Sequence, residues 1–176
     1  MRTLTLTESK QWCVQHTIEL DSRGLPLYPA PEFRALRCRL PGINQLTWFS
    51  RLVSTSLQPR ARCLLWVTGW GIWPSSENWH LYYRLRESHG DRGAIQDTPA
   101  HLFLEHEADD EVTFIEAGIL FGWDMYLLPS RRQGLVFVSH DEFAVFMMEA
   151  GPMAKCEAEL RDAGLVPVAM ELAPSA

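Results

Sequence analysis

Long apolar runs are missing from this chain of 176 residues. The two longest, at 63–67 and 143–148, are much shorter than the roughly 20 residues that cross a bilayer. The first ten residues lack the apolar core of a signal peptide. We therefore expect a cytoplasmic protein without a membrane segment.

Cysteine is also scarce. The chain has four widely spaced cysteines and no Cys-x-x-Cys pair: Cys13, Cys38, Cys63 and Cys156. Each lies among apolar or helical neighbours, a context typical of buried, reduced thiols. We expect no disulfide framework, because small secreted domains that depend on one are much richer in cysteine.

Signatures of catalysis and of cofactor binding are rare as well. No Gly-x-Ser-x-Gly turn occurs, and no cysteine stands in a nucleophile-type context. The Gly-x-Gly around Trp70 lacks the third glycine of a dinucleotide-binding loop, and its tryptophan would block a pyrophosphate. His101 and His106 are five residues apart, which suits neither a helical nor a strand zinc site. We expect no metal and no cofactor.

One acid–base combination stays open. Glu77, His80, Asp124 and His140 could exchange protons with a substrate if their loops converge. The sequence does not decide this. A small-molecule-binding protein or enzyme, with a pocket beside the Trp-rich loop 70–80, is therefore the alternative to a purely binding function.

Charge is distributed unevenly along the chain. Residues 1–92 carry 12 Lys and Arg against 7 Asp and Glu, a balance of +5, whereas residues 93–176 carry 4 against 15, a balance of −11. The acidic half opens with a group of candidate binding carboxylates: Glu105, Glu107, Asp109, Asp110 and Glu111. Such a field disfavours nucleic acid and favours a basic protein partner, although a solvated helix face has the same composition.

Aromatic residues concentrate in 64–83, which holds four of the seven tryptophans. Five residues of this stretch are further candidates for binding: Trp70, Trp73, Asn78, Trp79 and His80. They form either a core segment or a recognition surface, since tryptophan is frequent in both. As a surface, the stretch would also suit the contact of a homodimer.

Local patterns predict a single α+β domain over 1–176, with a central sheet of about five strands and five or six flanking helices. A mixed α/β arrangement is the alternative. The apolar run 62–68 is typical of a central strand covered on both faces. Glycine is expected to end the helices that precede Gly122 and Gly164. We expect residues 171–176 to form a frayed tail.

Six helices are predicted from caps and apolar spacing, starting near Thr7, Asn44, Pro74, Asp109, Ser139 and Pro152. The fifth would place Phe143, Phe146 and Met147 towards the core.

Three blocks of the sequence resemble a family of small bacterial proteins of unassigned function: LLWVTGWGIWPSSENWHLYYRLRESHGD, PAHLFLEHE and GWDMYLLP…VFVSHDEF. The likeness covers Leu64–Phe143 and implies no catalytic residue. The C-terminal third also resembles SUKH-type immunity proteins, in its Gly-Trp-Asp, its hairpin, and Ser139–Phe143 opening a helix. That resemblance implies a small acidic α+β domain that binds and neutralises a toxin in the producing cell.

These observations favour a non-enzymatic, immunity-like binding module whose acidic C-terminal half meets a basic protein partner. The enzyme or small-molecule-binding protein, and the homodimer joined through the Trp-rich stretch, remain as alternatives.

Overall fold

The computed structural model describes residues 1–27, 33–58, 61–70, 79–131 and 133–171. Within these ranges the strands are β1 (Arg2–Leu4), β2 (Arg34–Arg39), β3 (Arg62–Gly69), β4 (Ala100–Leu104), β5 (Asp124–Pro129), β6 (Gly134–Ser139), β7 (Phe143–Met148) and β8 (Val168–Met170). The helices are α1 (Leu6–Gln15), α2 (Leu46–Ser56), α3 (Trp79–Ser88), α4 (Ala108–Leu120) and α5 (Ala150–Asp162). Short 3-10 turns, η1 (Ile43–Gln45) and η2 (Glu105–Glu107), precede α2 and α4.

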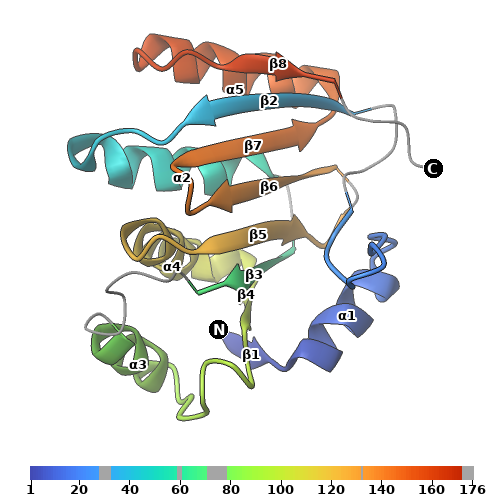
Figure 1. The fold of residues 1–176 in the computed structure, drawn as a ribbon, viewed down its shortest axis with the longest axis vertical. Helices are drawn as coiled ribbons and strands as arrows, with labels where there is room; N and C mark the ends of the chain where they lie inside the picture. Colours follow the sequence, from blue (N-terminus) through green and yellow to red (C-terminus); the bar gives the residue numbers. More distant parts are fainter. Residues whose placement is uncertain (28–32, 59–60, 71–78, 132, 172–176) are drawn as a thin grey trace.

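The strands form one antiparallel sheet in the order β1-β4-β3-β5-β6-β7-β2-β8 (Figure 1). The predicted combination of helices and strands is confirmed, but the expected five strands are too few. The outermost strands, β1 and β8, have three residues each, too few to show an alternating pattern.

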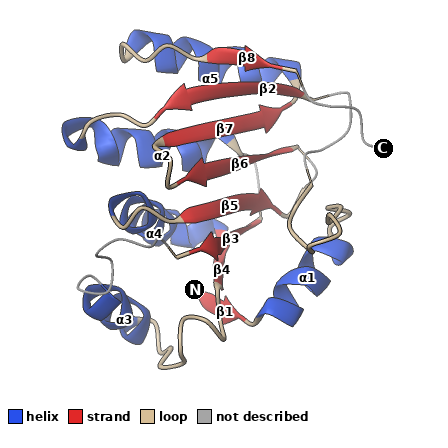
Figure 2. Cartoon of the chain, in the orientation of Figure 1, coloured by secondary structure: helices blue, strands red, loops and turns tan. Residues whose placement is uncertain are grey.

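Helices cover the two faces of the sheet unequally. Buried side chains of α2, α4 and α5, together with Tyr82 of α3, form one core with alternate residues of the strands. Trp12 and Cys13 of α1 form a second core on the opposite face. Figure 2 shows α2 and α5 running behind the strands, whereas α1 lies beside the lower part of the sheet.

The central position predicted for 62–68 is confirmed. In β3, Cys63, Leu65 and Val67 belong to the first core, and Leu64 and Trp66 to the second. All five are buried, because successive strand residues point to opposite faces and both faces are covered here.

The fifth predicted helix is wrong. Phe143–Met148 forms strand β7, which pairs with both β6 and β2. The preceding turn is a three-residue hairpin loop in which Glu142 adopts a left-handed conformation with φ 62°. A run of six apolar residues does not distinguish a strand from a buried helix, and Ser and Asp begin turns as readily as helices.

Other local predictions succeed, with shifted limits. Thr5, not Thr7, caps α1: its hydroxyl accepts from the Glu8 amide at 3.2 Å, and the Glu8 carboxylate accepts from the Thr5 amide at 2.8 Å. Gly122 and Gly164 follow α4 and α5 with φ of 65° and 82°, as predicted.

Three predictions lie outside the described residues: the helix start at 74–77, the loop around Trp73, and residues 172–176 of the expected tail. The four cysteines are buried free thiols, which confirms that prediction. Among the described residues, no helix has both the length and the apolarity to span a membrane.

Gly134→Ala should destabilise the protein by about 2 kcal/mol, because overpacking and backbone strain act together. Gly134 has φ 146°, and an added Cβ would collide with the carbonyl oxygen of Met147 and lie 2.7 Å from Cβ of Met148. Urea unfolding monitored by circular dichroism measures the change.

Gly151→Ala in α5 is the matched control. An added Cβ meets nothing within 4 Å there, so helix propensity should stabilise the protein by up to about 1 kcal/mol. Equal effects of the two substitutions would contradict the strand register at Gly134.

Candidate functional site

The described tryptophans of the Trp-rich stretch lie against the core. Trp70 packs edge-on against Trp123, with ring centres 4.8 Å apart, and against Tyr82 at 6.2 Å. Trp79 is half-buried and also packs on the first core. His80, the next residue, is exposed. Trp73 and Asn78 lie outside the described residues.

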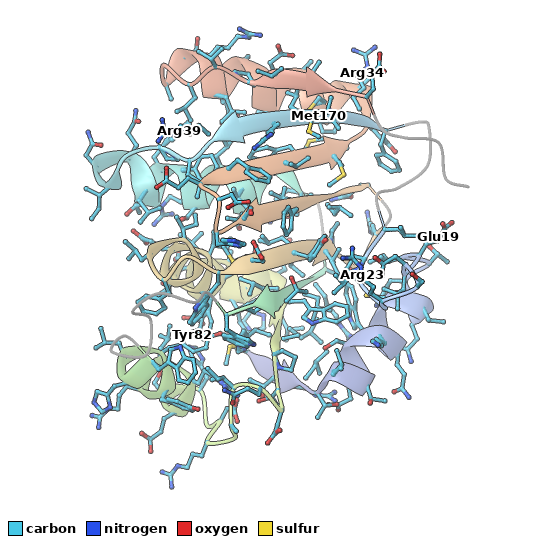
Figure 3. All side chains as sticks on the ribbon, viewed as in Figure 1. Glu19, Arg23, Arg34, Arg39, Tyr82 and Met170 are labelled. Carbon is cyan, nitrogen blue, oxygen red and sulfur yellow. The ribbon has the colours of Figure 1, made fainter. Side chains whose placement is uncertain are left out.

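Tyr82 is the centre of this aromatic group. Figure 3 shows it between α3 and the sheet, and its side chain is buried. Its ring meets Trp70, Phe114, Phe121 and Trp123 edge to face, and such pairs stabilise a core beyond the area they bury.

A polar network runs through this aromatic core. The Tyr82 hydroxyl hydrogen-bonds Nε2 of His101 in β4. Nearby, Nε of Arg86 donates to Asp91 at 2.9 Å, and a second guanidinium nitrogen donates to Asp91 and Thr98. Within the described part of the chain, Nδ1 of His101 and the other terminal nitrogen of Arg86 have no hydrogen-bond partner.

Burial is the main cause of the pKa shifts of His101 and Tyr82 in this network. Desolvation, helped by the nearby Arg86 cation, lowers the pKa of His101 from 6.5 to about 3, so the imidazole is neutral at physiological pH. Desolvation also raises the pKa of Tyr82. Tyr82 and His101 are both buried, and the hydrogen bond between them holds α3 against β4.

The five acidic candidates do not form one surface. Glu107 accepts from the amino terminus of Met1 and from the Leu104 amide, and Glu111 is buried. Asp109 pairs with Arg51 at 3.4 Å, and Asp110 approaches His89 at 3.9 Å. Three of the five carboxylates remain on the surface: Glu105, Asp109 and Asp110.

A wider acidic region appears when the helices are considered together. On one face of the sheet α2 lies between α4 and α5, and we call these three helices the acidic layer. They carry seven Asp and Glu against three Lys and Arg, a formal balance of −4. The layer includes Glu157, Glu159 and Asp162 of α5, which are about 50 residues from Asp109 in sequence.

The structure also brings together Asp124 and His140, two members of the acid–base combination left open by the sequence. Nδ1 of His140 lies 2.9 Å from both carboxylate oxygens of Asp124, and the His140 amide donates to the same carboxylate at 2.9 Å. The ion pair raises the pKa of His140. His80, the other described member, lies on α3, and no contact joins it to this pair.

Gly69 determines how closely Asp124 approaches β3. The register between β3 and β5 shifts between Val67 and Gly69, and Gly69 pairs with Asp124. A Cβ at Gly69 would lie 2.7 Å from a carboxylate oxygen of Asp124. The Asp124 carboxylate orients the imidazole, and Nε2 lies 3.5 Å from Asp141. No cluster of three metal-binding side chains occurs among the described residues.

Two features of the structure were not predicted from the sequence. At the end of α3, the buried guanidinium of Arg86 pairs with Asp91, which lies just beyond the helix. The carboxylates of α5 join those of α4 only through the packing of both helices against α2. Spacing along the chain carries no signal for either arrangement.

Comparison of the chain with protein-family models, with curated proteins and with solved structures gives no match.

Stability should fall in acid because of His101. The unfolded chain takes up a proton at pKa 6.5, whereas the folded protein resists it down to about 3. The free energy of unfolding should therefore decrease by about 1.4 kcal/mol per pH unit below 6.5 through this group. Urea unfolding at a series of pH values, compared with His101→Gln, isolates the contribution. Parallel pH profiles of the two proteins would show that His101 does not carry it.

His140 should behave in the opposite way. Its pKa, followed by NMR, should lie above 6.5 and fall back in Asp124→Asn, with a smaller change in Asp141→Asn, whose carboxylate lies 3.5 Å from Nε2. Its contribution to stability is complete below pH 6.5 and is lost as the pH rises through the folded pKa. An unchanged pKa in Asp124→Asn would refute the pairing.

Proposed function

We propose that this protein is a non-enzymatic binding module that holds a basic protein partner on its acidic layer. The observation that carries the proposal is the position of a carboxylate on α5 that does nothing for its helix. Asp162 is exposed and is the last residue of α5, where the helix dipole disfavours negative charge. A carboxylate retained there is better explained by a partner than by the stability of α5.

The charges of the layer are available to a partner. Asp109 is paired with Arg51, but their side chains are 90% and 61% exposed, so the pair contributes little to stability. The Lys155–Glu159 and Arg161–Glu157 pairs are also exposed, and each spans one turn of α5. An incoming cation can exchange with these weak pairs at small cost.

Opposite charge mainly accelerates association and selects the partner, and apolar contacts supply most of the affinity. The resemblance of the C-terminal third to SUKH-type immunity proteins points to a toxin as the basic partner, neutralised when the module covers its working surface. The structure has the hairpin of that resemblance, β5–β6, but a strand in place of the helix after Ser139. That assignment of the partner is part of the proposal.

Affinity for the partner should depend on the acidic layer and on salt. Immobilised protein would be used to capture partners from the source cell, and binding of the captured protein would be titrated against purified variants. Asp109→Asn with Asp162→Asn should weaken binding about tenfold, because interface charges govern encounter and complementarity. Raising the salt from about 0.05 to 0.5 M should weaken it further, through screening.

Glu19→Gln with Asp97→Asn is the matched control. It removes two exposed carboxylates from loops outside the layer, so net charge changes equally while the layer stays intact. Equal losses in the two double variants, or an affinity indifferent to salt, would refute the acidic layer as the interface.

A further inference from the structure

A second surface, which carries two arginines, lies on the other face of the sheet. Leu36 and Cys38 of β2 belong to the core beneath the helices, so the alternation of the strand sends Arg37 and Arg39 to the opposite face. Both arginines are exposed, which shows that this end of the face is open to solvent. Figure 3 shows Arg39 and Arg34 at opposite ends of β2.

The arginines border a shallow groove of about 520 Å³, between β2, β8 and the turn that joins β6 to β7. Phe143, Val166 and Val168 supply its apolar lining. Val166 and Val168 are 73% and 60% exposed, and they lie just before β8 and at its first residue. Beyond them, β8 is the last strand of the sheet.

The guanidinium of Arg37 is positioned to bind a ligand. Its guanidinium carbon lies 3.9 Å from the centre of the Phe143 ring, a cation–π contact that fixes the plane of the group. No carboxylate within the described ranges pairs with Arg37. Arg39 pairs with Glu142 at 3.0 Å, but their side chains are 83% and 70% exposed, so this pair is readily exchanged.

We propose that this groove binds an acidic, aliphatic segment of a partner protein. A carboxylate of the segment pairs with Arg37, whose planar fork matches two carboxylate oxygens. Aliphatic side chains of the segment cover Val166 and Val168, and its backbone extends along the free edge of β8.

The local charge selects this occupant. Asp141 and Glu142 stand at the rim of the groove and balance Arg37 and Arg39. A polyanion such as nucleic acid would meet no net attraction there, whereas a single carboxylate can satisfy Arg37 and leave the rim undisturbed. The surface is therefore distinct from the acidic layer in position and in the sign of its ligand, and the inference does not depend on the proposed function.

A synthetic peptide tests the proposal. The probe is a fluorescein-labelled, end-capped peptide with valine, glutamate and valine at alternate positions and serine between them, flanked by glycine. In a strand this spacing puts the single carboxylate and the aliphatic side chains on one face, as Arg37 and Val168 are. The peptide is titrated with the protein by fluorescence anisotropy. We expect saturable binding, at least about tenfold weaker in Arg37→Gln, because a charge-assisted bidentate contact is lost. In ¹⁵N NMR spectra the affected amides should lie in β2, in β8 and in the 140–142 turn.

Arg34→Gln is the matched control. Arg34 is exposed on the same strand, but the alternation places it on the helical side, in a groove with Met153 and Glu157. The affinity of the Arg34→Gln variant for the peptide should equal that of the unmodified protein. Both substitutions are at exposed positions, so neither should prevent folding, which circular dichroism would verify.

Four outcomes would overturn the proposal. The first is equal binding of a peptide with glutamine in place of glutamate, because apolar contact alone would then explain affinity. The second is tighter binding of a phosphoserine version, which would assign the groove to phosphate. The third is an equal loss in Arg34→Gln and Arg37→Gln. The last is no saturation at about 1 mM protein, where recognition is negligible.

Discussion

Burial of β3 and β5 on both faces is the constraint on which the rest of the structure depends. Adjacent residues of these strands pack in two separate cores, one on each face of the sheet. Both a helical layer and α1 are therefore required to keep water from the middle of the sheet. Strands further from the middle need less cover. One face of β2 is therefore free to carry Arg37 and Arg39, while its other face stays in the core.

The same architecture places the helix carboxylates and the side chains of Arg37 and Arg39 on opposite faces of the sheet. Helices α4 and α5 can bear carboxylates on their outer sides because their buried apolar residues already pack in the core beneath the sheet. The acidic layer and the arginine groove thus face away from each other, with the whole thickness of the sheet between them.

Prediction from sequence succeeded where a pattern is local. Thr5 lies two residues from the predicted cap of α1, and Gly122 and Gly164 end their helices as expected, because capping depends on a few neighbouring atoms. It failed at Phe143–Met148, whose apolar side chains suit a helix and a strand equally. Pairing with β6 and β2 decided between them, and those strands start 9 and 109 residues earlier.

The chain alone determined the mixture of helices and strands, the buried thiols, the central position of 62–68 and the uneven charge along its length, since each follows from composition or from short-range periodicity. Only tertiary structure decided which charged residues share a surface. Packing buried Glu111, paired Glu107 with the amino terminus, placed α5 and its Asp162 beside α2, and brought Asp124 to His140. Which of these residues lie together depends on strand order and helix packing. Both arise from contacts between segments that are distant in the sequence.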